Sequence, residues 1–194
     1  MARIYKAAGL VFPELEELDL IGAWEILGST RRLFRDGVLK DAYFELETCG
    51  AEQGIVKCCH DLKIVVEKPI SELPKYDVVL IPGGPGRAEA QKDSRIIGAI
   101  KKAHEKGAVL ASVCTGAFIV AQAGLLEGKK ATSYHAFMGK LADYGVTPVN
   151  ERLVVNGRVI TGAGPPASVD VGMKVVEMLL GPEALQKVKD WVTY

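Results

Sequence analysis

The chain has 194 residues, of which 48% are hydrophobic and 25% are charged, and this is enough to bury a substantial core. Its 24 basic and 24 acidic residues cancel, and lysine and arginine occur at most in pairs, so we expect no nucleic-acid partner. The longest apolar stretch, residues 111–126, is interrupted by polar residues and is too short to span a membrane. Because the N-terminus does not resemble a secretory signal, we expect a cytoplasmic protein with no membrane partner.

Segments typical of strands and of helices alternate along the first two thirds of the chain. They lie at residues 4–12, 20–27, 42–49, 55–66, 77–81, 96–104, 108–113 and 117–123. Such alternation favours an α/β domain with a mostly parallel sheet that is covered by helices. The apolar runs 78–81 and 108–113 lack polar alternation, which predicts central strands buried on both faces.

The C-terminal third continues this pattern. Residues 129–134 resemble a strand, and residues 152–164 resemble a hairpin whose turn is Asn156-Gly157. A helix is predicted to begin at Pro165-Pro166 and to stop at Gly181. No linker or repeat interrupts the sequence, so we expect one domain over residues 1–194.

The four cysteines show neither CxxC nor metal-ligand spacing, and we expect reduced thiols. Cys58, Cys59 and His60 form one unusual cluster. If these residues lie on a strand, the adjacent cysteines point to opposite faces, and a metal site would need ligands from elsewhere in the chain. We therefore expect no metal.

Cys114 lies where a buried strand is predicted to turn into a helix. Tight strand-to-helix turns of this type expose a nucleophile above the sheet, and Gly116 would let the helix and the strand approach closely. The N–H groups at the helix start would stabilise a thiolate and lower the pKa of the thiol. The alternative is that Cys114 is a small apolar side chain of the core.

A glycine pair, Gly83-Gly84, follows the predicted strand 78–81. Because the C-terminal ends of parallel strands lie together, we expect this loop beside Cys114. The backbone N–H groups of Gly84 and Thr115 would then form an oxyanion hole. The alternative is an ordinary glycine-rich turn.

Two titratable residues have two possible roles each. Asp19 either caps a helix or lies near Cys114, where burial would raise its pKa enough for it to keep a proton. His135 is expected at the end of the strand that follows Cys114, where it either faces the cleft or is an ordinary strand-end histidine.

Three stretches carry a resemblance to a known family. They are LVFPELEELDLIGAWEIL, VLIPGGPG and ASVCTGAFIVAQAGLLEGKKATSYH. In order and spacing they resemble the ThiJ/PfpI superfamily of the class I glutamine-amidotransferase-like fold and, within it, the isonitrile hydratases. The resemblance extends from Arg3 to about Leu180. It implies a flavodoxin-like three-layer sandwich, a nucleophile elbow and a homodimer.

The resemblance also implies roles for individual residues. Cys114 matches the nucleophile, and Asp19 matches the acid that hydrogen-bonds its sulfur. Gly84 and Thr115 match the backbone donors near the sulfur. The residues that would line the substrate pocket are Gly83, Tyr134, His135 and Gly164.

Thr115 distinguishes among the branches of the superfamily. PfpI-type peptidases carry histidine at this position, and glutamine amidotransferases have a late His-x-Glu pair that residues 161–170 lack. The chain also departs from the hydratases, which have His-Trp where this sequence has Tyr134-His135, and it differs again at Gly162–Pro166.

We therefore expect a cysteine-dependent hydratase that acts on a small electrophilic carbon without a metal or an organic cofactor. Cys114 would add to an isonitrile, Asp19 would donate a proton, and water would release an N-substituted formamide. One alternative is a glyoxalase or deglycase acting on 2-oxoaldehydes, which usually also needs a histidine and so depends on His135. Another alternative is a non-enzymatic redox or stress protein with an oxidisable Cys114.

Overall fold

The computed structural model describes residues 2–194, and a seven-stranded sheet forms its centre. The strands of this sheet are β1 (Arg3–Leu10), β2 (Ala42–Gly50), β5 (Lys68–Pro69), β6 (Val78–Ile81), β7 (Val109–Val113), β10 (Leu153–Asn156) and β11 (Val159–Gly162). Their order is β10-β11-β7-β6-β1-β2-β5, and every pair is parallel except β10–β11. The predicted mostly parallel sheet is therefore confirmed, and all residues of β6 and β7 are buried as expected.

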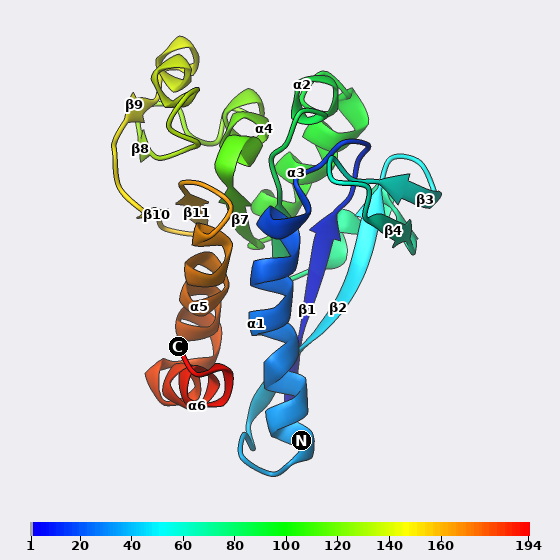
Figure 1. Ribbon diagram of the computed structural model, residues 1–194, viewed down its shortest axis with the longest axis vertical. Coiled ribbons are helices and arrows are strands. Elements are labelled where there is room, and N and C mark those ends of the chain that lie inside the picture. Colours follow the sequence, from blue (N-terminus) through cyan, green and yellow to red (C-terminus); the bar gives the residue numbers. More distant parts are fainter. Residues whose placement is uncertain (1) are drawn as a thin grey trace.

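Helices connect the strands and cover the sheet (Figure 1). They are α1 (Glu17–Arg35), α2 (Arg87–Ala90), α3 (Ser94–Glu105), α4 (Ala117–Gln122), α5 (Ala167–Leu180) and α6 (Pro182–Val192). In the strand order, β2 lies on one side of β1, whereas β7 lies on the other side of β6. The chain therefore crosses the sheet in opposite directions when it passes from β1 to β2 and from β6 to β7. Because such crossovers are right-handed, α1 and α3 lie on opposite faces of the sheet, and α1 packs against α5. No helix within residues 2–194 has both the length and the apolar character needed to cross a membrane.

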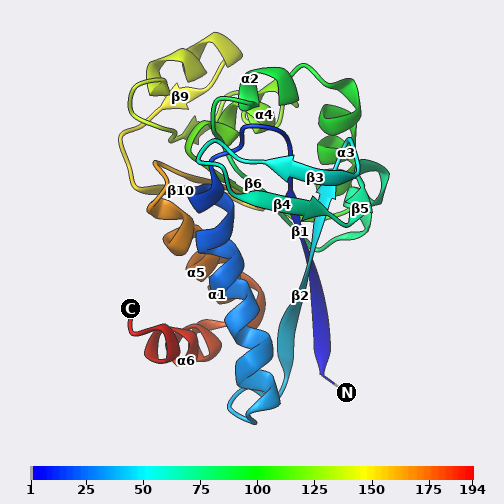
Figure 2. The same ribbon diagram turned by 45° about the vertical axis from the view of Figure 1, so that its right-hand side comes forward.

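Short elements complete the fold. Two further two-stranded sheets pair β3 (Gly54–Lys57) with β4 (Lys63–Val66) and β8 (Lys130–Ala131) with β9 (Thr147–Pro148). Three 3-10 segments are η1 (Ile70–Lys75), η2 (Cys114–Gly116) and η3 (Met138–Tyr144). Figures 1 and 2 place the β3–β4 hairpin at the end of the sheet toward which β1 points.

Several boundaries differ from the expected ones. The segment predicted over residues 55–66 is a hairpin, and Cys58, Cys59 and His60 occupy its turn instead of a strand. The strand predicted over residues 129–134 is reduced to the two residues of β8. The helix after Pro165-Pro166 begins at Ala167 and ends at Leu180, directly before the predicted stop at Gly181.

The strand order reverses between β1 and β6. Ligands of open α/β sheets bind at such a reversal, outside the C-terminal ends of the strands. The start of α1, the loop after β6 and the turn after β7 all lie at this edge. The topology therefore brings together the three segments that the sequence singled out.

Candidate active site

Cys114 occupies a tight turn directly after β7. Its backbone φ is +56°, in the left-handed region that L-residues rarely adopt, and such conformations typically cost about 1–3 kcal/mol. The Ser133 hydroxyl donates a 2.7 Å hydrogen bond to the Cys114 carbonyl oxygen and helps to hold the turn. A Cβ atom at Gly116 would lie 2.3 Å from the Ile81 carbonyl oxygen, so only glycine lets this turn pack against the end of β6. The structure thus has the tight strand-to-helix turn that was predicted.

Asp19 lies in the first turn of α1 with only 1% of its surface exposed. The Gly83 N–H donates to its Oδ2 atom at 2.8 Å, and its buried Oδ1 atom has no hydrogen-bond partner among the described residues. The N-cap residue of α1 is Glu16, so the alternative that Asp19 caps the helix is wrong. Burial raises the pKa of Asp19 to about 7; the Gly83 hydrogen bond opposes this rise and the Glu16 charge adds to it. Near neutral pH this carboxyl group therefore carries a proton for part of the time.

The pKa of the Cys114 thiol is also raised, to about 12. Burial is the largest cause and the Asp19 charge adds to it, whereas a hydrogen bond from the Thr115 N–H lowers the pKa. The N–H at the helix start therefore acts in the predicted direction, but burial outweighs it, and the expected net lowering of the pKa is wrong. Since an ionised Asp19 opposes the thiolate and a protonated Asp19 does not, the titrations of Cys114 and Asp19 are coupled.

The two predicted backbone donors differ in their surroundings. The Thr115 N–H lies close enough to the Cys114 sulfur to lower the pKa of the thiol. The Gly84 N–H instead donates to the Thr115 hydroxyl at 3.1 Å. Gly84 has φ +109°, and a Cβ atom there would lie 2.3 Å from the Glu16 nitrogen, so the close approach of the loop to α1 requires glycine.

A cavity of about 530 Å³ lies beside the cysteine turn. Its wall is formed by Glu16, Gly84, Pro85, Arg87, Ala88, Cys114, Thr115, Tyr134, Phe137 and Pro165.

Of the four residues predicted to line the pocket, only Tyr134 lies in the wall of this cavity. Tyr134 lies in the wall, and Gly164 lies behind the Tyr134 ring. Gly83 lies behind the wall, against Thr115 and Asp19. His135 is exposed, and its ring packs on the outer side of Tyr134 with 4.4 Å between the ring centroids.

Arg87 and Glu16 are wall residues that the sequence did not single out. The Arg87 guanidinium lies over the Phe118 ring, 4.6 Å from its centroid, and its buried Nε atom has no hydrogen-bond partner within the described chain. Burial lowers the pKa of Arg87, and its attraction to a Cys114 thiolate opposes this lowering. Its place directly after the glycine loop, at the binding edge of the sheet, is the signal that could have identified it.

Comparisons with known proteins agree with this arrangement. Residues 5–178 match the model of the DJ-1/PfpI family. The isonitrile hydratase of Pseudomonas putida is 29% identical over 185 residues, which cover 95% of this chain and 76% of that protein. The glutathione-independent glyoxalase DJR-1.2 of Caenorhabditis elegans is 26% identical over 183 residues, which cover 92% of this chain and 91% of that protein.

A solved structure supports the same conclusion about the fold. The ThiJ/PfpI family protein from Pseudomonas syringae superposes with a TM-score of 0.88 at 27% identity, over 100% of this chain and 76% of that protein. The architecture is therefore the flavodoxin-like sandwich that the sequence predicted. With the cysteine turn, the glycine loop and a family match over most of its length, the chain belongs to the DJ-1/PfpI family.

Proposed function

We propose that this chain is a cysteine-dependent enzyme that hydrates a small electrophilic carbon, with isonitriles as the substrate class and N-substituted formamides as products. The observation that carries the proposal is the buried Asp19 carboxyl group, which lies close enough to Cys114 for each to shift the pKa of the other, beside a cavity of about 530 Å³ whose wall includes Cys114. The similarity to an isonitrile hydratase over most of the chain supports the same chemistry.

The reaction needs only these groups and water. The Cys114 thiol passes its proton to Asp19, and the sulfur then bonds to the terminal carbon of the isonitrile. Asp19 delivers the proton to that carbon, which gives a thioimidate. Water adds to the thioimidate carbon and one of its protons goes to the nitrogen; the carbon–sulfur bond then breaks, and the second proton returns to the sulfur through Asp19 as the formamide leaves. The sum is one isonitrile plus one water, with no change in the redox state of the protein.

The cavity wall favours this substrate class over 2-oxoaldehydes. Much of the wall is apolar and suits the organic substituent on the isonitrile nitrogen; this part consists of Pro85, Ala88, Tyr134, Phe137 and Pro165. Among the residues that the structure describes, the wall contains no histidine, and His135 lies exposed outside it. The glyoxalase hypothesis therefore lacks the imidazole on which it depends.

The test is incubation of the purified protein with a simple alkyl isonitrile in ¹⁸O-labelled water, with the formamide measured by mass spectrometry. We expect one labelled oxygen per formamide. Cys114→Ser should abolish turnover, and Asp19→Asn should reduce it by about 10²–10⁴-fold, as for loss of a general acid. Cys49→Ala is the matched control, because Cys49 is a fully buried thiol of β2 outside the cavity wall, and it should retain turnover per folded molecule.

Two other outcomes would overturn the proposal. Cys114-dependent conversion of methylglyoxal to lactate without formamide formation would make the protein a glyoxalase. Selective oxidation of Cys114 by dilute peroxide, without turnover of either compound, would favour the redox alternative.

A further inference from the structure

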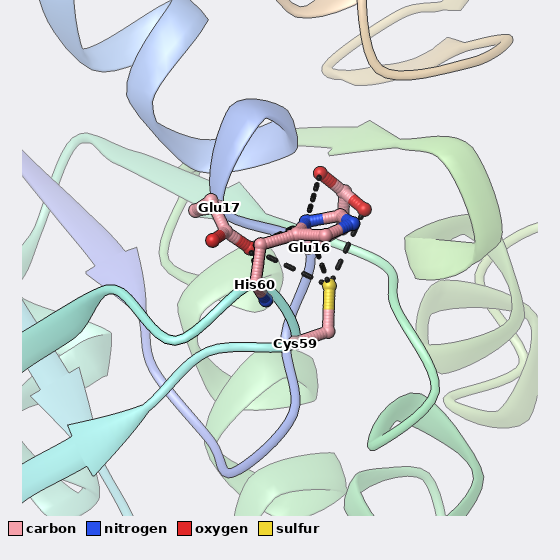
Figure 3. Close-up of side chains that lie close together, drawn as sticks. All are labelled: Glu16, Glu17, Cys59 and His60. Atoms are coloured by element: carbon pink, nitrogen blue, oxygen red, sulfur yellow. Dashed lines mark hydrogen bonds and ion pairs between the residues drawn. The ribbon is translucent and has the colours of Figure 1, made fainter.

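Four side chains with metal-binding atoms converge beside the cavity (Figure 3). Glu16 and Glu17 come from the start of α1, and Cys59 and His60 come from the turn of the β3–β4 hairpin. One donor atom from each side chain lies within 4.8 Å of the others. The sequence separates the two pairs widely, and the fold brings them together.

Backbone hydrogen bonds fix the two segments against each other. The Glu14 N–H donates to the Lys57 carbonyl oxygen at 3.0 Å, and the Cys59 N–H donates to the Leu15 carbonyl oxygen at 3.0 Å. The hairpin turn is thus tied to the residues immediately before α1. The positions of the four side chains therefore rest on an ordered backbone.

The contacts around the Cys59 sulfur exceed what a thiol can satisfy. Its sulfur lies 3.4 Å from Glu16 Oε2, 3.4 Å from Glu17 Oε2 and 3.4 Å from His60 Nδ1. A thiol has one hydrogen to donate, so the two carboxylate oxygens compete for it, and the tautomer of His60 decides whether its ring nitrogen accepts as well. Burial and the two carboxylates raise the pKa of Cys59 to about 12. A bound cation would remove this competition.

The charges of the cluster are not balanced by the protein. The Glu16 and Glu17 side chains are only 19% and 16% exposed. Within residues 2–194 the ion pairs of these two carboxylates are with His60 alone, and the nearby Lys57 pairs with Asp61. Two mostly buried carboxylates beside a neutral thiol and a titratable imidazole provide a negative site for a divalent cation.

The distances match the geometry of one metal ion in particular. Tetrahedral zinc, with bonds of about 2.0 Å to nitrogen and oxygen and about 2.3 Å to sulfur, places its ligand atoms roughly 3.3–3.5 Å apart. The sulfur contacts are 3.4 Å, and His60 Nδ1 lies 3.2 Å from Glu17 Oε2 and 3.6 Å from Glu16 Oε1. With one oxygen of Glu16 as the ligand, four of the six edges of the tetrahedron are therefore already close to their bound lengths.

We propose that Glu16, Glu17, Cys59 and His60 form a zinc-binding site that joins the β3–β4 hairpin to the start of α1. On binding, the Cys59 S–H bond breaks, its proton passes to solvent and the sulfur–zinc bond forms, with no change of oxidation state. Contrary to the expectation from sequence, the ligands from elsewhere in the chain are present, because the cysteine lies in a turn that faces α1. Since Glu16 also lines the cavity, the ion would fix one part of its wall.

The test uses the purified full chain after removal of metals with a chelator. Titration with Co²⁺ should give one equivalent of a tetrahedral spectrum with a thiolate-to-cobalt charge-transfer band, and Zn²⁺ should displace the cobalt. Cys59→Ser should remove the charge-transfer band. His60→Ala should weaken binding by more than the roughly 10–100-fold that loss of an outer-shell partner causes.

Two control variants make the result specific. Asp61→Asn removes an exposed carboxylate from the same turn, where asparagine tolerates the φ of +70°, and it should bind Co²⁺ as the unmodified protein does. Cys114→Ser should also retain the site, which separates it from the proposed catalytic cysteine. His60 is 69% exposed, so its variant is expected to fold, and circular dichroism checks this. No tetrahedral spectrum, or binding that survives Cys59→Ser and disappears in Cys114→Ser, would overturn the proposal.

Discussion

The buried carboxyl group of Asp19 makes the stability of the protein depend on pH. Its pKa of about 7 in the folded protein compares with an ordinary value of 3.8. Between these values the folded state binds more protons than the unfolded state, so stability falls as the pH rises. The fall is about 1.4 kcal/mol per pH unit and reaches about 4 kcal/mol above pH 7.

Asp19→Asn removes this titration while its amide oxygen can still accept the Gly83 N–H. The free energy of unfolding of the variant, minus that of the unmodified protein, should therefore increase by about 3 kcal/mol between pH 5 and pH 8. Urea denaturation followed by circular dichroism at several pH values measures the difference. Asp143→Asn, at an exposed position of η3, controls for the loss of one negative charge.

A difference that does not change with pH, or that decreases as the pH rises, would refute this reasoning. It would show that Asp19 ionises in the folded protein near its ordinary pKa. An Asp19 with an ordinary pKa would be a weaker acceptor for the Cys114 proton than the proposed hydration requires.

Three further predictions follow from the packing. Gly116→Ala should lower the free energy of unfolding by at least about 2 kcal/mol, because the added methyl group would collide with backbone atoms. Gly98→Ala in α3, where the added methyl group has open space, should raise the free energy of unfolding by up to about 1 kcal/mol. Urea denaturation compares the two variants. Ser133→Ala removes the hydrogen bond to the Cys114 carbonyl oxygen and should cost about 1–3 kcal/mol, with turnover falling more than the folded fraction does. The homodimer stays a prediction, and Val65, 58% exposed on β4, is a candidate contact between the subunits. Val65→Lys should lower the molar mass measured by light scattering after gel filtration toward that of a monomer. An unchanged molar mass would exclude this face as the interface.

Part of the site could be predicted from the sequence because the C-terminal ends of neighbouring parallel strands lie at one edge of the sheet. The buried runs 78–81 and 108–113 mark neighbouring parallel strands, so the glycine loop and Cys114 had to meet at one edge. The position of Asp19 beside the sulfur required the family resemblance, because the residues alone fitted a helix cap as well.

Other properties depend on tertiary contacts that no local pattern records. The pKa of Cys114 follows from burial and from a carboxylate on another element, not from its own turn. The cluster at Cys59 forms because the hairpin turn packs against residues 43 positions earlier in the chain. Strand alternation, which placed Cys58 and Cys59 on opposite faces, could not anticipate a turn that folds back onto α1.

The proposed catalytic cysteine is held by contacts between distant parts of the chain. The hydrogen bond from Gly83 to Asp19 spans 64 positions, and the bonds that support the cysteine turn span 31 and 19. In the unfolded chain all four thiols should titrate near a pKa of about 8.5 and react alike with an alkylating reagent. The Cys114 thiol acquires its distinct reactivity only when these long loops have closed. Pulsed alkylation during refolding can therefore measure when the sheet edge forms, from the time at which the alkylation rate of Cys114 departs from its rate in the unfolded chain.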